Sequence, residues 1–422
     1  MNPEYRLLTK RTILVFFSFF NLYAGYMVGS RLMICFGFTL LFLLVFTWHA
    51  AHNFFRDIKA ERLHYPRVFE EEQIRVRIRI EPGTPIPLYM LELTDTFPAG
   101  DSYWIHSLLP EPIDSRSTVE VEYRTECTRH RGVYVLGPLK MTCSDPLGIH
   151  RRRIELPVIT DLLLYPTAPD LEYFELLEDG TLSQVGMETL LRPGHSEEFT
   201  GLREFDYGDN PRHIHWPSSV RNQKLLVKEF REDITTEVTL FLDMRRLSLS
   251  GVGDITSVEY IVKAAAAVAR AAVDKSHMVQ FFALGGNKEH VPLGGGYQHL
   301  ITILDRLTYL RPKGESAFEH DLALHIPELK RGSTAVLIAS ATSIHPEKLS
   351  PLVRRMRDRN ILTTVVLIDD RSFIKMWREQ DFRWKKALPI RQLQEILRRE
   401  GCSLFMAAKG DDVAEKLQAP LK

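Results

Sequence analysis

The sequence predicts a multidomain protein with an N-terminal transmembrane helical hairpin, then a β-sandwich domain, then an α/β domain built on a parallel sheet. Three observations predict this order: two uncharged apolar runs at the start, short alternating strand patterns in the middle, and alternating strand and helix patterns in the last third. The 422 residues are enough for two or three domains.

The hairpin is predicted from the apolar runs Thr12–Ser30 and Leu32–Ala50, which contain no charged residue. Each has roughly the 20 residues that a helix needs to cross a bilayer, and only Arg31 separates them. A signal peptide fits poorly, because the first run is long and a second follows at once. A buried soluble hairpin would usually carry a polar stripe. We therefore expect a cytoplasmic tail at 1–11 and a two-pass hairpin at 12–50.

The orientation of the hairpin follows from the basic residues at its flanks. The turn has one, Arg31, whereas three precede the first span and three follow the second: Arg6, Lys10, Arg11, Arg56, Lys59 and Arg62. Because cytoplasmic flanks are enriched in lysine and arginine, both termini are expected in the cytoplasm and the protein in the inner membrane.

A β-sandwich is predicted for residues 67–165, after a linker at 51–66. In Gln73–Ile80, four aliphatic residues alternate with arginines, which is typical of a strand with one buried face. Further strand-like segments follow, separated by proline and glycine. The run Arg151–Arg153 is expected on a solvated face, with contact to a lipid headgroup or a partner as the alternative.

The α/β domain is predicted for residues 237–422. Glu237–Met244 is an apolar strand that contains Asp243 near its end, and Thr256 and Glu259 have the spacing of a capping box before a helix to about Asp274. Strands and helices then alternate to the C-terminus, with Gly401 closing the last long helix. Ligands of such sheets bind at the carboxyl ends of strands, where Asp243 and Asp369–Asp370 lie.

The first candidate position for a bound metal is Asp243. A metal-binding version of this architecture is the von Willebrand factor A-type domain, in which Asp-x-Ser-x-Ser follows the first strand. Here Arg245 and Leu247 occupy the two serine positions, and the segment Ile338–Thr342 supplies no aspartate after the later strand. We therefore expect no bound metal or cofactor, and we expect Asp243 to pair with Arg245 or to cap a helix.

Other kinds of site have weak support. His213 and His215 could share one face of a strand as zinc ligands, but no third ligand has a convincing spacing. The chain has no nucleophile elbow, phosphate-binding loop or His-Glu-x-x-His motif, and Gly294–Gln298 is expected to be a plain turn. With 54 basic and 54 acidic residues, nothing attracts the whole chain to nucleic acid. The four cysteines are expected to be reduced thiols.

The connecting segment 166–236 contains the most unusual stretch, Leu202–Trp216. From Glu197 to Asp233, eight acidic and six basic residues interleave, which suggests paired charges that hold the path of the chain. Gly208 favours a turn, and Trp216 offers a large apolar anchor. A clamp between domains and a partner-binding surface are the two leading interpretations, and a catalytic site is the third.

This stretch resembles the domain of unknown function 58 family, whose pattern is Glu-Phe-x-x-Leu-Arg-Glu-Tyr-x-x-Gly-Asp-x-x-Arg-x-Ile-x-Trp, then Ala-Arg and Leu-x-Val-Lys. The matching positions are Glu198, Phe199, Leu202, Arg203, Glu204, Gly208, Asp209, Arg212, Ile214, Trp216, Arg221, Leu226, Val227 and Lys228. The departures are Phe205 for Tyr, His215 for Asp, Pro217 for Lys and Val220 for Ala. His215 raises the question of what replaces the family's carboxylate.

The resemblance implies a membrane-anchored protein that works with a MoxR-type AAA+ ATPase in the assembly or maturation of other proteins. We therefore expect a non-enzymatic adaptor. Its candidate partner-binding residues are Arg203, Glu204, Tyr207, Gly208, Asp209, Arg212, Ile214, Trp216, Arg221 and Lys228. The alternatives are a hydrolase that uses Asp209, His213 or His215, and a purely structural interdomain clamp.

Overall fold

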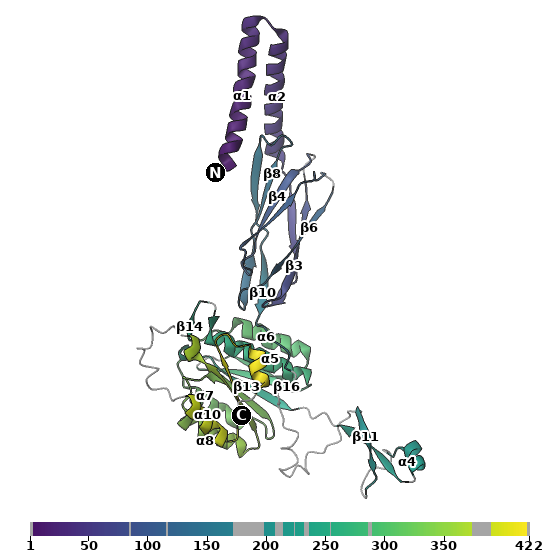
Figure 1. Ribbon diagram of the computed structural model, residues 1–422, viewed down its shortest axis with the longest axis vertical. Helices are drawn as coiled ribbons and strands as arrows, with labels where there is room; N and C mark the ends of the chain where they lie inside the picture. Colours follow the sequence, from purple (N-terminus) through teal and green to yellow (C-terminus); the bar gives the residue numbers. More distant parts are fainter. Residues whose placement is uncertain are drawn as a thin grey trace. The chain divides into compact units, whose positions relative to one another are not determined.

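The computed structural model describes residues 3–83, 86–114, 117–171, 198–206, 214–222, 224–231, 236–253, 255–285, 289–373 and 390–419 (Figure 1). The main division of the chain into two compact units falls between Thr167 and Ala168. Tyr207, Gly208, Asp209, Arg212 and His213, which the sequence analysis singled out, lie outside the described residues.

The first unit begins with two antiparallel helices, α1 (Pro3–Val28) and α2 (Arg31–Asn53). Both are long and apolar enough to cross a membrane. They pack closely at Gly37, where an added Cβ would lie 2.7 Å from Leu22 Cγ, and the Ser18 hydroxyl donates to Gly37 O at 2.8 Å. The polar hydroxyl is therefore satisfied inside the hairpin, as an apolar surrounding requires.

Residues 51–66 are more than the linker that we expected. Helix α2 continues to Asn53, and Phe54 and Phe55 are buried in the core of the β-domain. They are followed by the strand β1 (Lys59–Leu63), which pairs antiparallel with β3 (Gln73–Glu81). The linker prediction was wrong because β1 is short and its partner strand lies beyond a second turn.

The β-domain contains three sheets, ordered β1-β3-β6, β2-β10-β7 and β5-β4-β8-β9. The predicted alternation is confirmed in β3, where Ile74, Val76, Ile78 and Ile80 are buried. One core cluster joins β3 with residues of β4 and β8, so two of the sheets share an interior. The remaining strands are β2 (Arg67–Phe69), β4 (Tyr89–Thr96), β5 (Trp104–Leu109), β6 (Val119–Glu126), β7 (Gly132–Leu136), β8 (Leu139–Ser144), β9 (Arg151–Leu156) and β10 (Thr160–Tyr165).

A buried arginine links all three sheets of the β-domain. Arg62 of β1 donates to both carboxylate oxygens of Asp95 in β4, at 3.0 Å through Nε and at a shorter distance through Nη2. Its Nη1 donates to Leu136 O of β7 at 3.1 Å, to Val158 O at 2.9 Å and to the Thr160 hydroxyl of β10 at 3.1 Å. A planar guanidinium with five donors suits this position, because it can bond several acceptors at once.

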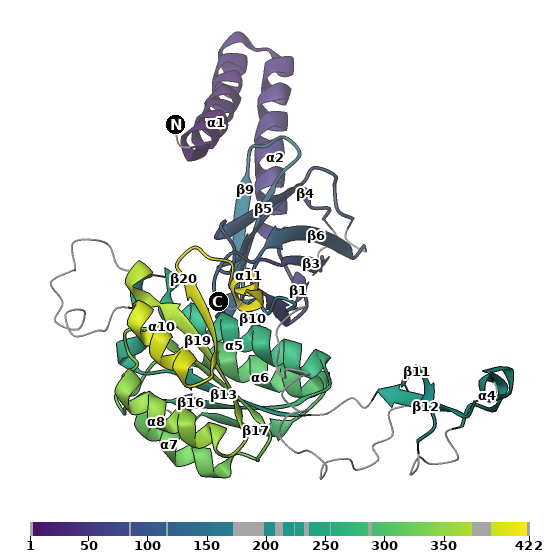
Figure 2. The ribbon, with the colours of Figure 1, turned by 60° about the horizontal axis from the view of Figure 1, so that its bottom comes forward.

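The second unit is built on a six-stranded sheet in the order β17-β16-β13-β18-β19-β20 (Figure 2). Five of these strands are parallel: β13 (Glu237–Asp243), β16 (Met278–Leu284), β18 (Thr334–Ser340), β19 (Leu362–Asp369) and β20 (Ser403–Ala408). The edge strand β17 (His290–Gly294) runs antiparallel to β16, so the sheet is mixed rather than fully parallel. The sequence pattern did not predict β17, because a proline and a glycine interrupt its short apolar run.

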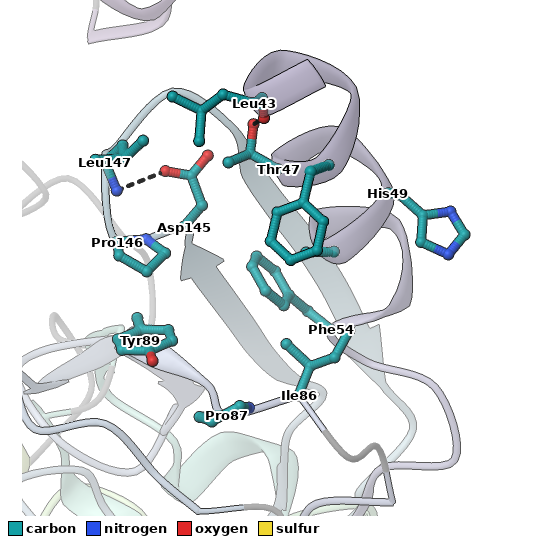
Figure 3. A pocket seen from close by; sticks show the side chains of 12 residues that line it. Leu43, Thr47, His49, Phe54, Ile86, Pro87, Tyr89, Asp145, Pro146 and Leu147 are labelled. Atoms are coloured by element: carbon teal, nitrogen blue, oxygen red, sulfur yellow. Dashed lines mark hydrogen bonds between the residues drawn. The ribbon is translucent and has the colours of Figure 1, made fainter. Parts of the chain in front are cut away.

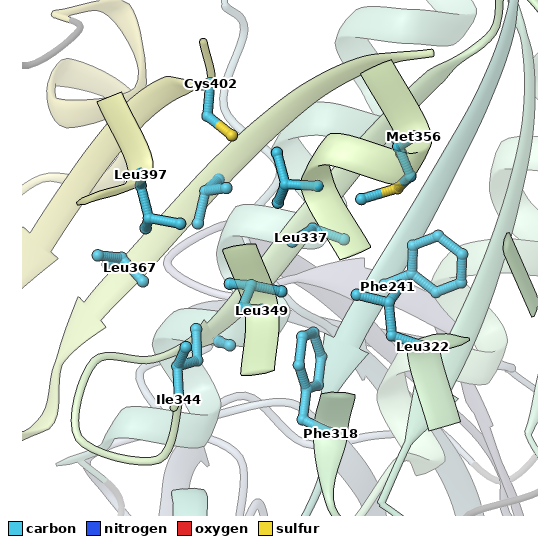
Figure 4. Packing of buried hydrophobic residues seen from close by; sticks show 14 of the residues in the cluster. Phe241, Phe318, Leu322, Leu337, Ile344, Leu349, Met356, Leu367, Leu397 and Cys402 are labelled. Carbon is cyan, nitrogen blue, oxygen red and sulfur yellow. The ribbon is translucent and has the colours of Figure 1, made fainter. Parts of the chain in front are cut away.

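Helices cover both faces of this sheet: α5 (Ser257–Asp274), α6 (Tyr297–Tyr309), α7 (Phe318–His325), α8 (Pro346–Arg357), α10 (Ile390–Arg399) and α11 (Val413–Gln418). On one face, α7, α8 and α10 pack over Phe241, Leu337 and Leu367 (Figure 4). Helix α5 contacts β13, β16, β18 and β19. Its alanines 264–267 are completely buried, which allows a close approach of helix and sheet.

The start of α5 was predicted correctly, but its capping was not. Thr256 occupies the N-cap position without a side-chain hydrogen bond to the helix. Instead, the Ser257 hydroxyl accepts from Ser250 N at 2.8 Å and donates to Ser248 O at 2.5 Å. The hydroxyl of Ser257 therefore connects the start of α5 to the segment that follows β13. At the other end, Gly401 after α10 has φ +81°, as its predicted role as a helix stop requires.

Candidate functional site

The first candidate site lies at the carboxyl edge of the six-stranded sheet. The strand order reverses between β13 and β18, and in open α/β sheets this reversal point is where ligands bind. Asp243 ends β13, and Ser343 lies just beyond the end of β18. The side chains at this reversal point therefore decide whether the domain has room for a ligand there.

An internal ion pair occupies the reversal point. Arg245 donates to both oxygens of Asp243, through Nε to Oδ1 at 2.8 Å and through Nη2 to Oδ2 at 2.8 Å. The Ser343 hydroxyl also donates to Asp243 Oδ2, at 2.6 Å, and Arg245 Nη2 donates to Ser343 O at 2.9 Å. Asp243 is 0% exposed and Arg245 3%. The predicted pairing of Asp243 with Arg245 is confirmed.

The surroundings of Arg245 favour its charged form. Burial by itself lowers the pKa of a guanidinium, but the hydrogen bond and charge of Asp243, with the charges of Glu319 and Asp321, raise the pKa of Arg245 above its ordinary value. Gly285 makes room for the side chain, because an added Cβ there would lie 2.4 Å from Arg245 Cγ. With φ +103°, this position also has a backbone conformation that favours glycine.

The arrangement is suited to holding two segments together. The guanidinium lies against the carboxylate of Asp243, and its bonds connect the end of β13 to the turn after β18. Among the described residues, no three His, Cys, Asp or Glu side chains form a group that could hold a metal ion. The sequence pointed to Asp243 and Arg245, but it did not indicate Ser343, which is 100 residues away.

A second carboxylate at this edge, Asp370, is also buried. It follows β19 and begins the short helix η4 (Asp370–Phe373). It accepts from Thr342 N at 3.2 Å and from the Thr342 hydroxyl. Burial raises the pKa of Asp370 above 3.8, while its hydrogen bonds oppose that shift.

This shift predicts a pH dependence of stability. Because the pKa of Asp370 is higher in the folded state, the folded state binds the proton more tightly, and the contribution of Asp370 to stability falls as pH rises from about 4 toward 7. Asp370→Asn should remove that contribution, so its stability relative to wild type should improve with rising pH. Denaturant unfolding across this range tests the prediction, with the exposed Asp274→Asn as control. A constant difference between wild type and Asp370→Asn would contradict it.

An exposed apolar hairpin stands at the same edge. It consists of β14 (Gly251–Val252) and β15 (Ile255–Thr256), which pair antiparallel after the short helix η2 (Arg246–Ser248). Val252 is 84% exposed, and Leu247, Leu249 and Ile255 are exposed as well. Four exposed aliphatic side chains in nine residues are unusual on a soluble surface and are typical of an interaction site.

The second candidate site is the signature segment. It forms a two-stranded antiparallel sheet of β11 (Glu198–Glu204) and β12 (Leu226–Arg231), with the short helix α4 (Trp216–Asn222) before β12. Arg203 pairs in register with Val227, and Ile214 makes an isolated bridge to the same residue. Val227 is buried, so Arg203 and Ile214, which are distant from it in the motif, both pair with one buried residue.

Most described residues of the motif are exposed. Trp216 is 61% exposed, and Leu202 and Leu225 are exposed beside polar positions. The exposed Lys224 and Glu204 form an ion pair at 2.6 Å, which agrees with the predicted charge pairing but adds little stability at a surface. Of the ten candidate residues, the structure describes Arg203, Glu204, Ile214, Trp216, Arg221 and Lys228.

His215 has a structural role that the sequence left open. Its Nδ1 accepts a hydrogen bond from Ser218 N at 3.3 Å, just before the first turn of α4. The Ser219 hydroxyl donates to His215 O at 2.9 Å and accepts from Leu226 N at 2.9 Å, which joins α4 to β12. A carboxylate at this position would accept from the same amide. The Nδ1 of His215 therefore caps the start of α4.

This role predicts that His215→Asp strengthens α4. A carboxylate accepts the Ser218 N–H and interacts favourably with the helix dipole, so we expect a gain of about 0.5–1 kcal/mol in local stability, and a loss of similar size for His215→Ala. Hydrogen exchange of the Ser218 and Ser219 amides measures both. Slower exchange in His215→Ala than in His215→Asp would show that the side chain does not cap the helix.

These features define a class of protein: two helices able to cross a membrane, a region of several β-sheets, and an α/β region with a mixed sheet whose ligand position is filled from within. Residues 201–373 match the family described as "Protein of unknown function DUF58". Over this region, the chain belongs to the DUF58 family.

The relatives add little on function. The chain is 21% identical over 243 residues to the "Uncharacterized protein YeaD" of Bacillus subtilis (strain 168), a match that covers 56% of this chain and 58% of that protein. Crystal structures of a GH20 exo-β-N-acetylglucosaminidase from Vibrio harveyi, with N-acetylglucosamine and as an inactive mutant, are 10% identical over 74% of this chain and 57% of theirs. Their TM-scores of 0.19 and 0.20 are too low to support an inference.

Proposed function

We propose that this protein is a membrane-anchored, non-enzymatic adaptor that works with a MoxR-type AAA+ ATPase in the assembly or maturation of other proteins. In this proposal the helices α1 and α2 cross the inner membrane with both termini in the cytoplasm. The α/β domain is a von Willebrand factor A-like domain in which Arg245 replaces the metal ion. The match is to a family of unknown function, and the surfaces of the protein supply the support for the proposal.

The observation that supports the proposal best is the exposure of Trp216. Tryptophan is enriched among the residues that dominate the energy of protein interfaces, and a large exposed aromatic ring is costly to keep in water without a partner. Arg221 lies on the same short helix, and Lys228 on the adjoining strand. These positions fit an apolar anchor with a charged rim.

The ion pair at the reversal point favours binding over catalysis. Asp243 and Arg245 are almost completely buried and bonded to each other, so neither is available to a substrate. In the same way, the Nδ1 of His215 is engaged with the backbone of α4 and is not available as a base. The exposed hairpin at Val252 offers a second surface, which suits a protein that brings two others together.

The proposal predicts that Trp216→Ala lowers recovery of the ATPase in a pull-down from solubilised membranes. Hot-spot residues contribute at least about 2 kcal/mol, so recovery should fall more than about tenfold. Trp104→Ala is the matched control, because Trp104 is an exposed tryptophan of β5, in the other unit. If wild type, Trp216→Ala and Trp104→Ala are all folded and recover the ATPase equally, docking through the signature segment is contradicted. If Val252→Ala lowers recovery of the ATPase instead, the docking surface lies at the carboxyl edge of the six-stranded sheet.

A further inference from the structure

A pocket of about 410 Å³ lies within the first unit, beside the last turns of α2 (Figure 3). One wall is formed by Leu43 and Phe46 of α2 and by Phe54, which directly follows this helix. The opposite wall is formed by Ile86 and by Pro146 and Leu147, from the loop between β8 and β9. These six lining side chains are apolar, and three of them belong to the helix that is long and apolar enough to cross a membrane or lie just beyond its end.

The amides of the loop between β8 and β9, Asp145–His150, are hydrogen-bonded within the loop. The Asp145 carboxylate accepts from Leu147 N at 2.9 Å, Ile149 N at 3.0 Å and His150 N at 2.7 Å. Gly148 N donates to Asp145 O at 2.9 Å. Asp145 itself is 1% exposed, whereas Leu147 at the tip is 52% exposed. A loop whose amides are bonded internally can lie at the edge of an apolar phase, where free amides would be costly.

Two contacts show that this loop and β9 run alongside α2. Leu147 lines the same pocket as Leu43, and Arg152 Nη1 lies 3.2 Å from His52 Nδ1. Along the helix, Leu43 and His52 are separated by about 13 Å, at about 1.5 Å per residue. Because Leu147 lines the same pocket as Leu43, the loop tip reaches back along the apolar part of α2, whereas Arg152 lies at the end of that helix.

The basic residues of β9 lie near the end of α2, beyond its apolar part. Arg151, Arg152 and Arg153 come directly after the loop, at the level where α2 ends. Arg151 is paired with Glu92, whereas Arg152 and Arg153 are exposed. Trp48 of α2 is exposed close to His52, and tryptophan is enriched at the headgroup level of membranes. The apolar tip of the loop, the ring of Trp48 and the arginines therefore follow the order of layers in a bilayer, from the hydrocarbon core to the phosphates.

We propose that the loop Asp145–His150 dips into the bilayer and that the pocket beside α2 holds an acyl chain of an anionic phospholipid. This inference rests on the proposed membrane anchorage. The lipid enters sideways from the bilayer, because Leu43 and Phe46 belong to the apolar run of α2. Its phosphate lies against Arg152, which contacts His52 at the end of α2, as the charge of this side chain favours. Such a lipid would fix the β-domain at the membrane surface.

The depth of the loop can be measured on the full chain in vesicles of phosphatidylcholine with one quarter phosphatidylglycerol. A spin label at Leu147→Cys, in a Cys35→Ser background, reports on it, since the other three cysteines are buried. Val133→Cys, an exposed apolar position on β7, is the matched control. We expect the label at Leu147 to be relaxed mainly by oxygen and the label at Val133 mainly by a water-soluble nickel complex. Equal access of the nickel complex to both would overturn the proposal.

The bound lipid can be counted by native mass spectrometry of protein released from the same vesicles. Arg152→Gln should lower the retained phosphatidylglycerol by about fivefold, as expected for one arginine at an anionic surface. Arg75→Gln, which changes an exposed arginine of β3, is the charge-matched control and should retain wild-type levels. Wild-type retention in Arg152→Gln would contradict the proposed phosphate contact. Displacement of the lipid by soluble glycerol phosphate would show that the site needs no acyl chain, and would overturn it.

Carbonate extraction of native membranes separates this inference from the anchorage. If the chain resists extraction and the label at Leu147 is exposed to water, the lipid site is wrong and the anchorage stands. If carbonate releases the chain, the anchorage is wrong and the lipid site fails with it. Resistance together with a label buried in lipid supports both.

Discussion

Arg245→Ala should lower the free energy of unfolding of the α/β domain by about 3–5 kcal/mol. The substitution leaves the carboxylate of Asp243 buried, with the Ser343 hydroxyl and the backbone amide of residue 245 as remaining donors and no opposite charge from the described residues in bonding distance. An uncompensated charge in a dry interior is among the most costly defects a fold can carry. Denaturant unfolding of the detergent-solubilised chain, followed by a probe in the α/β domain, measures the loss.

Two further variants separate the charge from the packing. Asp243→Asn combined with Arg245→Met removes both charges and keeps most of the volume, so we expect it to be much closer to wild type than Arg245→Ala. Arg245→Ser leaves space beside Asp243 and supplies a hydroxyl, so magnesium should raise its unfolding midpoint more than that of wild type. If the double variant is as unstable as Arg245→Ala, packing rather than the unpaired charge explains the loss.

Arg62→Ala should destabilise the β-domain by a similar amount, about 3–5 kcal/mol. The substitution leaves the carboxylate of Asp95, which is 1% exposed, without its paired positive charge. It also removes the donors to Leu136 O and Val158 O. The Tyr123 hydroxyl would still donate to Asp95, at 2.6 Å, but it is neutral. Burial, together with the charge of Asp95, raises the pKa of Tyr123, so this phenol stays protonated and remains a donor. Thermal unfolding of the β-domain is the measurement.

Conservative and surface substitutions provide the controls for Arg62. Arg62→Lys keeps the charge but not the planar fork, so it should recover only part of the lost stability. Arg79→Ala removes an exposed arginine that pairs with Glu120, and it should change the unfolding midpoint little. If Arg62→Lys matches wild type, charge alone is sufficient and the five-donor geometry is unimportant.

The elements with a clear period were predictable from the sequence. The alternation in Gln73–Ile80 became β3, and the apolar runs at Glu237–Met244 and Ile361–Asp370 became β13 and β19 with shifts of a residue or two at their ends. Length and the absence of charge predicted the two long helices. In these segments the local pattern and the burial agree, so a single stretch of chain contains the information needed.

Elements without a clear local pattern were missed. The strand β9 begins with three arginines, and nothing in that run indicates that Arg152 lies beside His52 at the end of α2. The strand β1 is a five-residue segment whose place is decided by pairing with β3. In both cases the partner lies elsewhere in the chain, and the free energy of pairing, rather than local propensity, decides the structure.

The sequence by itself determined the order of the parts, the presence of Arg245 and Leu247 after Asp243, and the family signature that ends in Trp216. It also indicated that Arg245 could neutralise Asp243, because two residues of separation after a strand bring the side chains together. Only the tertiary structure decided that Ser343 completes this pair, that Arg62 joins three sheets, and that Leu147 lies beside Leu43. These contacts join residues far apart in the chain, and their strength comes from burial, which no local stretch of sequence specifies.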